Sequence, residues 1–326
     1  MIPRKSDAGQ IAALLDGLQA SPWIGAARQW WPQFIFHFTD IRNVVSILTA
    51  GKLLPRSRSN MATDIASAGV LDNTADTWKE YVRLYFRPRT PMQWNNEGIR
   101  PRGGLTSLLA HCPVPVFLLF DSKDILSRAT TRFSEGNLAG SGVRVGDDAV
   151  FLASIPFEKV YHDSALSEDG KRNVVFHRHA EVMIPQELEL SGLKYIICRS
   201  EAETETLRNL LTPQTRSQFD GRICEARRAN LFFRRWTFVE TASLEQQKVV
   251  LNFNHGTNSP GPFAAHLEVR NLATGDKYEW QAPEYLAGST CTISIPQLVE
   301  STSYEVTFAL DGALAYMGGF NPGPMF

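Results

Sequence analysis

Glu181 is the residue whose surroundings most suggest chemistry. It lies in the stretch 174–185, where two histidines, one arginine and this glutamate separate two apolar ends. The apolar ends predict a single β-strand, in which alternation places His179 and Glu181 on one face and Arg178 on the other. A carboxylate between apolar runs is costly to bury without a partner. Glu181 therefore requires a counter-charge or an open cleft; the alternative is a solvated glutamate on a half-exposed strand.

His37 and Thr39 lie where a second predicted strand gives way to a helix. The run 34–40 has strand character, and the apolar positions that follow it repeat with helical spacing. Thr39 or Asp40 can cap that helix, and Asn43 lies in its first turn. A lone histidine at a strand end is more often structural than functional, so this junction does not define a site by itself.

Arg89 lies in a rigid turn. The predicted strand 81–86 runs into Arg87-Pro88-Arg89-Thr90-Pro91-Met92. The two prolines fix the backbone in extended conformations. Such a turn can hold one arginine at a defined place; the alternative is a surface arginine without a partner.

Other patterns predict the elements that surround these motifs. A short amphipathic helix is expected over 7–20, and buried strands are expected over 115–120 and 195–198. Ser200 begins a further helix by its capping pattern. The polar run 56–76 is expected to form a loop or a partly helical lid.

The chain after Glu240 has a different character. Short β-rich runs follow at hairpin-like spacing and predict a small all-β sandwich over 245–326, which leaves 1–242 as the first domain. From Glu245 onward, eight acidic and three basic residues give a net charge of −5, whereas the preceding residues carry +4. An acidic domain is a poor surface for nucleic acid. We expect it to be accessory, either packed against the first domain or bound to a protein partner.

Composition limits the setting in which the protein acts. The 326 residues are 43% hydrophobic, which is enough for a substantial core. The four cysteines are far apart and form no CxxC pair, which argues against a zinc site or a disulfide framework. No apolar run is long enough to span a bilayer, and the start of the chain lacks the pattern of a signal peptide. We expect a cytoplasmic protein with no metal and no membrane contact.

Three motifs in this order resemble the DarT family. They are His37-Phe38-Thr39 with Asn43, the run Tyr85–Met92 (YFRPRTPM), and the run Arg178–Val182 (RHAEV). Members of that family are NAD-dependent ADP-ribosyltransferases that modify bases in single-stranded DNA, usually as toxins paired with an antitoxin. The resemblance extends over about residues 34–240. It implies an α+β domain with the split β-sheet of ADP-ribosyltransferases, two antiparallel halves around a nicotinamide cleft.

The resemblance also implies roles for individual residues. Glu181 and Arg89 are expected to be catalytic, with Arg89 close to the glutamate. The expected NAD-binding residues are His37, Thr39, Asn43 and Tyr85. The expected DNA-binding residues are His162, Arg178, His179 and Met92, of which the first two belong to the loop that precedes Glu181.

The chemistry of this reaction suits these residue types. Cleavage of the nicotinamide–ribose bond develops positive charge on C1 of the ribose. A carboxylate that faces this charge stabilises the transition state more than the ground state. The acceptor nitrogen of a base must lose a proton, which Glu181 could take as a general base. Arg89 could keep Glu181 ionised or orient the acceptor.

Three functions remain open at this stage. The first is ADP-ribosylation of a base in single-stranded DNA, either thymine or guanine. The second is the same transfer to RNA or protein, and the third is a non-catalytic nucleic-acid-binding module with a transferase fold, against which the three intact motifs argue. The partners expected for the first function are single-stranded DNA, NAD as ADP-ribose donor, and an antitoxin that is either an ADP-ribosyl-DNA hydrolase or an inhibitory protein.

Overall fold

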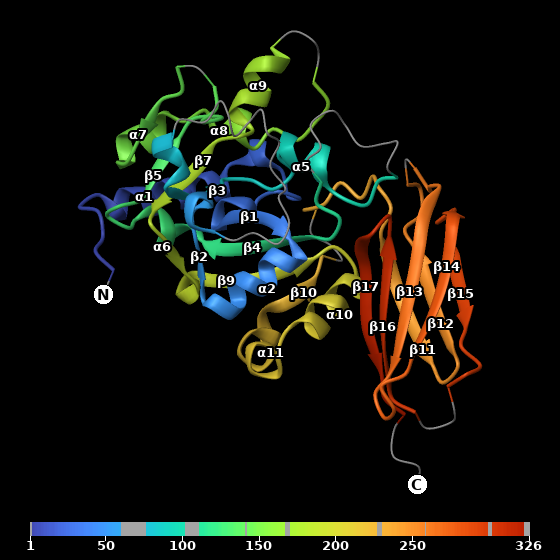
Figure 1. Cartoon of the computed structure of the whole chain (residues 1–326). Helices are drawn as coiled ribbons and strands as arrows, with labels where there is room; N and C mark the ends of the chain where they lie inside the picture. The colour runs from blue at the N-terminus through green and yellow to red at the C-terminus, as the bar shows by residue number, and fades with distance from the viewer. Residues whose placement is uncertain are drawn as a thin grey trace.

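The chain forms two parts, each with its own hydrophobic core (Figure 1). The computed structural model describes residues 2–59, 76–101, 111–140, 142–166, 170–226, 230–257, 259–298 and 302–322. The loop or lid expected over 56–76 lies mostly outside these residues. No helix in the described ranges has the length and apolar character needed to cross a membrane.

The first part is built on an eight-stranded sheet. Its strands, in spatial order, are β10 (Ile223–Glu225), β9 (Leu193–Cys198), β4 (Pro115–Asp121), β1 (Phe34–Asp40), β3 (Tyr81–Tyr85), β7 (Glu181–Pro185), β5 (Arg132–Ser134) and β6 (Val145–Gly146). Neighbours are antiparallel except β9 and β10. In the described chain, β1 and β3 pair only at Phe36 and Tyr85. The sheet therefore consists of two four-stranded halves joined at one residue pair, which confirms the expected split sheet and the α+β class.

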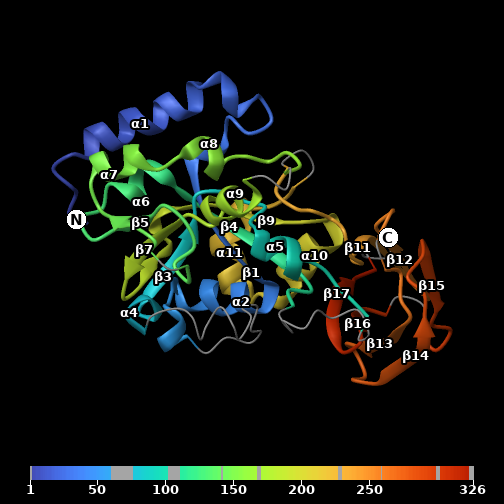
Figure 2. The ribbon, with the colours of Figure 1, turned by 90° about the horizontal axis from the view of Figure 1, so that it is seen from above.

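Helices cover this sheet on both sides. They are α1 (Ala8–Ala20), α2 (Ile41–Ala50), α4 (Asp76–Lys79), α5 (Pro91–Asn96), α6 (Ser122–Leu126), α7 (Ala149–Ser154), α8 (Phe157–Val160), α9 (Lys171–His177), α10 (Glu201–Leu210) and α11 (Pro213–Phe219). The short strands β2 (Lys52–Leu53) and β8 (Leu188–Glu189) pair with each other. Figure 2 shows α1, α7 and α8 on the opposite side of the domain from α2.

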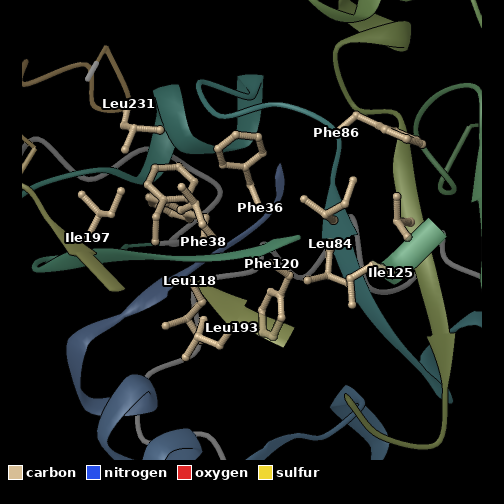
Figure 3. Packing of buried hydrophobic residues seen from close by; sticks show 14 of the residues in the cluster. Phe36, Phe38, Leu84, Phe86, Leu118, Phe120, Ile125, Leu193, Ile197 and Leu231 are labelled. Atoms are coloured by element: carbon tan, nitrogen blue, oxygen red, sulfur yellow. The ribbon is translucent and has the colours of Figure 1, made fainter. Parts of the chain in front are cut away.

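Local sequence signals account for the elements that carry the first motif. Asp40 ends β1 and caps α2, because its Oδ1 accepts the backbone N–H of Arg42 at 3.0 Å. Gly51 ends α2 with a φ of 70°, a conformation that favours glycine. In Figure 3, Phe36 and Phe38 lie on one side of the sheet and Leu118 on the other. The alternation of β1 therefore buries its phenylalanines on one face.

The stretch around Glu181 differs from the expectation of one continuous strand. Residues 174–177 belong to α9, and β7 begins only at Glu181. Phe176 packs so closely over Gly136 that a Cβ on that glycine would lie 2.4 Å from the ring. His177 Nδ1 bonds to the Glu135 carbonyl at 2.6 Å. These tertiary contacts outweigh the β-propensity of the valines and the phenylalanine.

The second part is a β-sandwich, as predicted. One sheet has the order β11 (Val239–Glu245), β12 (Lys248–Phe253) and β15 (Thr290–Ser294). The other has the order β14 (Lys277–Tyr285), β13 (Phe263–Asn271), β16 (Tyr304–Leu310) and β17 (Ala313–Phe320). The sandwich begins at Val239, so it takes in residues 240–242, which the sequence pattern placed in the first domain.

The sandwich packs against α10, which lies beside β17 in Figure 1. Ala202 of α10 belongs to the sandwich core. Thr206 Oγ1 accepts the Met317 N–H at 3.0 Å, and the Tyr316 hydroxyl donates to Glu205 at 2.8 Å. The two cores are thus connected through one helix.

Candidate active site

Glu181 lies where the two halves of the sheet meet. Its Cα pairs with that of Tyr85 on β3, and the residue is only 1% exposed, so the alternative of a solvated glutamate is wrong. Arg83 Nε donates to Oε2 at 2.5 Å, and Arg83 Nη2 donates to Oε1 at 2.6 Å. The Leu138 N–H adds a third donor to Oε1 at 3.3 Å. A two-pronged, charge-assisted pair of this kind fixes both the position and the orientation of the carboxylate.

Burial and the charge of Glu181 both act on the pKa values of its neighbours. Burial acts to lower the pKa of Arg83, but the paired Glu181 carboxylate outweighs it and raises that pKa above its ordinary value. Burial and the same carboxylate both raise the pKa of Tyr85. Arg83 is therefore a cation and Tyr85 a neutral phenol at neutral pH. Both lie on β3, on the face shared with Glu181.

Arg83 was missed in the sequence, although a signal for it exists. It precedes Tyr85 by two positions in a strand, so alternation places both on one face. Ser134 was missed as well: its Oγ accepts the Glu181 N–H at 3.1 Å and thereby fixes the start of β7. No local pattern reveals that contact, because Ser134 and Glu181 are brought together only by the pairing of β5 with β7.

The first motif lies beside β3. His37 Nδ1 is 3.3 Å from the Arg83 carbonyl. A carbonyl can only accept, so Nδ1 carries the hydrogen and Nε2 is the acceptor of the neutral ring. Burial lowers the pKa of His37 to about 4, against the opposing effect of that carbonyl, so the ring is neutral at pH 7. Asn43 Nδ2 donates to Thr39 Oγ1 at 3.1 Å, which leaves the Thr39 hydroxyl hydrogen for another acceptor.

Arg89 makes contacts different from those expected. Its Nε lies 3.6 Å from Asp163, its Nη1 bonds to Asn230, and its guanidinium lies 4.5 Å from the centre of the Phe233 ring. The counter-charge of Glu181, which the sequence assigned to Arg89, is therefore Arg83. A catalytic role for Arg89 stays a prediction. Its backbone has a φ of 57°, and its N–H donates to Gln93 Oε1 at 2.7 Å.

The loop before α9 gathers a second group of charges around Asp163. Arg87 is fully buried; its Nη2 binds Asp163 at 2.6 Å, and its Nη1 binds the Val160 carbonyl at 2.9 Å. Arg178 Nη2 lies 2.6 Å from His162 Nδ1. Burial and the positive charge of Arg178 lower the pKa of His162. Arg87 anchors this loop, a role that no sequence pattern predicted.

The two remaining expected residues occupy separate positions. Met92 Sδ lies 4.0 Å from the Tyr85 hydroxyl, so Met92 adjoins the group around Glu181. His179 Nδ1 bonds to the Val175 carbonyl at 3.0 Å, which leaves only Nε2 for a ligand. Burial lowers the pKa of His179 as well. Within the described ranges, no group of three or more His, Cys, Asp or Glu side chains is arranged to hold a metal ion.

Comparison with known proteins identifies one family. The model of the family "ssDNA thymidine ADP-ribosyltransferase, DarT" matches residues 36–232. No curated protein matches the chain. The similar solved structures include Thermus sp. 2.9 DarT in complex with ADP-ribosylated ssDNA, at 19% identity and a TM-score of 0.49, covering 62% of this chain and 97% of that one. Thermosipho africanus DarTG in complex with ADP-ribose is similar at 17% identity and a TM-score of 0.48, covering 66% of this chain and 54% of that one.

Proposed function

Since this chain belongs to the DarT family of single-stranded DNA thymidine ADP-ribosyltransferases, we propose that it transfers the ADP-ribose of NAD to a thymine base with Glu181 as the catalytic carboxylate. The observation that carries this proposal is the buried pair of Glu181 and Arg83 at the junction of the two half-sheets. The acceptor base and the roles of individual residues are the parts that need experiment.

Glu181 suits a reaction in which positive charge develops on the ribose. An ionised carboxylate offers about four acceptor positions, of which Arg83 and Leu138 use three. The remaining position can accept a ribose hydroxyl and so place the negative charge next to C1. Arg83 holds the carboxylate in this orientation, which lowers the reorganisation needed in the transition state.

The residues of the first motif suit the recognition of NAD. His37 Nε2 is an acceptor for a ribose hydroxyl or a carboxamide N–H. The Thr39 hydroxyl, which accepts from Asn43, can donate in turn. Tyr85 adjoins Glu181 and carries no charge that would compete with it. NAD is a substrate in this reaction: nicotinamide is released, and the ADP-ribose becomes bonded to the base.

The second group of charges suits the DNA strand. Among the residues that the structure describes, Arg87, Arg89 and Arg178 surround one carboxylate, that of Asp163, so positive charge is in excess there. The buried Nε of Arg178 has no hydrogen-bond partner within the described ranges. Such an excess attracts phosphates. We place His162, with Arg178 and His179, on the DNA side of the site, and Met92 against the base.

The test is mass spectrometry of defined oligonucleotides after incubation with NAD. Transfer is expected to a single-stranded oligonucleotide with one thymine and to be lost when that thymine is replaced by guanine, adenine or cytosine. A hairpin should be modified in its loop and not in its stem, because the base must be unstacked to reach the cleft. Modification of guanine, of RNA or of a protein in place of thymine would correct the acceptor, and absence of any transfer would overturn the proposal.

We also propose that the protein acts in the cytoplasm as the toxin of a toxin–antitoxin pair. The family resemblance supports an antitoxin that either removes ADP-ribose from DNA or binds the enzyme. Coexpression with the product of the neighbouring gene tests this, because an antitoxin is expected to restore growth. A neighbour that changes neither growth nor DNA modification would contradict it.

A further inference from the structure

Arginine and aromatic side chains alternate along a surface that begins at Arg89. The Arg89 guanidinium lies over the Phe233 ring, and Phe233 meets Trp94 edge to face at 4.8 Å between ring centres. Arg235 covers Trp94, with its guanidinium 3.6 Å from the ring centre. The row continues to Trp236, whose ring centre is 5.6 Å from the Arg235 guanidinium. Arg100 then lies 4.3 Å from the same ring.

We call these residues the arginine–aromatic row: Arg89, Phe233, Trp94, Arg235, Trp236 and Arg100. Trp94 belongs to α5, which faces the sandwich in Figure 1. Segment 233–236 leads into β11, so the row follows the seam between the two domains. This segment lies just beyond the residues that match the family.

Two features of the row indicate that it binds a ligand. Trp94 is 44% exposed, although tryptophan is costly to leave in water. Arg100 is only 3% exposed, and it has no hydrogen bond or ion pair to any described residue. The charge of Arg235 lies close enough to add to the effect of burial and lower the pKa of Arg100. A buried cation beside a second cation is satisfied by an anion.

Glu97, the carboxylate whose charge acts on Arg235, is already engaged in other hydrogen bonds. Glu97 accepts the N–H groups of Phe233 and Arg234 at 2.9 and 2.7 Å, and it also accepts from Gln93 Nε2 at 2.7 Å. Its acceptor positions are thus used to fix segment 233–236 against α5. Glu97 thus holds the row in place.

We propose that the arginine–aromatic row is an extension of the DNA-binding site that holds the strand beyond the modified base. A base stacks on the face of Trp94 that Arg235 leaves open, and phosphates lie near Arg235 and Arg100. Aromatic faces accept any base, and arginines follow the backbone, so the track adds affinity without sequence preference. This inference rests on the proposed function, because it assumes that the strand passes Arg89.

The experiment measures binding of labelled single-stranded oligonucleotides by fluorescence anisotropy. It compares oligonucleotides of about 4 and about 16 nucleotides, the range of site sizes for single-strand-binding domains. The test variants are Trp94→Ala and Arg235→Gln, with Trp94→Phe and Arg235→Lys as conservative partners. The matched controls are Trp280→Ala and Arg270→Gln, on strands β14 and β13 of the sandwich. Thermal unfolding confirms that each variant is folded.

We expect Trp94→Ala and Arg235→Gln to bind the long oligonucleotide roughly 5- to 100-fold more weakly. Affinity for the short oligonucleotide and its rate of modification should not change. Arg235→Gln should reduce the slope of log affinity against log salt by about 0.7, the value for one phosphate of a single strand, and Arg235→Lys should restore it. Trp94→Phe and both controls should bind nearly as the wild type does.

The failure of this inference is distinguishable from failure of the proposed function. If the wild type modifies DNA but both test variants bind the long oligonucleotide normally, the row is not a DNA track. Equal losses for the short and long oligonucleotides, or no dependence of wild-type binding on length, also overturn it. If the variants lose length-dependent binding but the wild type transfers no ADP-ribose to DNA, the row is confirmed as a DNA-binding site and the proposed function is wrong.

Discussion

Two buried carboxylate–arginine pairs in this molecule share their chemistry and differ in their surroundings. Glu181 pairs with Arg83 at the junction of the half-sheets, and Glu203 pairs with Arg199 at the start of α10. In both pairs the glutamate is at most 1% exposed. The arginines differ: the Arg83 side chain is 23% exposed, whereas that of Arg199 is fully buried.

The Arg199 pair is enclosed by further partners. Arg199 Nη1 lies 3.7 Å from Glu97, its Nη2 donates to the Pro113 carbonyl at 3.2 Å, and its guanidinium is 4.0 Å from the Phe238 ring centre. Burial raises the pKa of Glu203 to about 7, while Arg199 acts in the opposite direction. This pair connects the first domain to the sandwich, and neither of its side chains reaches solvent.

The difference shows why a buried charge pair does not identify a catalytic site by itself. Each pair has close contacts and one residue with a raised pKa, Arg83 in the first and Glu203 in the second, as structural and catalytic pairs commonly do. Of these two pairs, only the one at Glu181 has an arginine that reaches solvent. Replacing residues of the two pairs should therefore separate activity from stability.

The largest expected effect is that of Glu181→Gln on transfer. Glutamine keeps the shape of the side chain but removes the charge that we propose faces the ribose, so we expect transfer to single-stranded DNA to fall at least about 1,000-fold. The fold should persist, because Arg83 reaches solvent. Oligonucleotide mass spectrometry and thermal unfolding measure the two quantities. The matched change Glu203→Gln should leave the rate per folded molecule unchanged, and near wild-type transfer by Glu181→Gln would refute its catalytic role.

The next largest effect should be on stability, from Arg199→Met. The change leaves Glu203 and Glu97 buried without their shared cation, which typically costs about 3–5 kcal/mol. Urea unfolding should show this loss, while the folded fraction transfers ADP-ribose at the normal rate in the cold. Arg83→Met also leaves a buried glutamate without its cation and should cost stability, but it should in addition slow transfer by the folded fraction, because Glu181 loses its orientation. If Arg199→Met is as stable as the wild type, the enclosed pair is not structural.

The sequence predicted the elements around both pairs better than the pairs themselves. The strands at 34–40 and 115–120, the caps at Asp40 and Ser200, and the sandwich were predictable, because short-range patterns determine them. The helix over 171–177 was not, because Phe176 and His177 find their partners in a distant loop. Motif spacing located Glu181, but its counter-charge depended on the pairing of β3 with β7.

Arg89→Ala tests whether Arg89, in addition to Arg83, contributes to catalysis by Glu181. Because Arg89 contacts Asp163 and Phe233, its removal should disturb the acceptor side of the site. We expect transfer to fall about 10- to 100-fold, because the acceptor base is then held less well in position for reaction. The affinity for NAD should change little. Calorimetry with NAD provides the second measurement. Complete loss of NAD affinity would move Arg89 to a cofactor-holding role.

Arg83→Lys should have a smaller effect on transfer. Lysine keeps the positive charge but can bind only one carboxylate oxygen at a time, so the orientation of Glu181 is less fixed. We expect transfer to fall about 10-fold, with stability nearly unchanged. The ratio of kcat to KM for the DNA at saturating NAD measures this. A loss as large as that of Glu181→Gln would mean that Arg83 contacts the reacting groups directly.

The smallest expected effect is that of pH on the affinity for NAD between pH 8 and 5.5. Burial lowers the pKa of His37 to about 4, so the folded protein keeps the neutral ring and its Nε2 acceptor throughout this range. The affinity measured by calorimetry should then vary less than about twofold, whereas a histidine with an ordinary pKa near 6.5 would become charged within it. Stability should respond in a defined direction: the unfolded chain binds a proton at His37 between about pH 6.5 and 4 and the folded protein does not, so this residue lowers stability as the pH falls through that window. His37→Gln should remove that part of the pH dependence, and a large loss of NAD affinity centred near pH 6.5 would show that His37 is accessible to water.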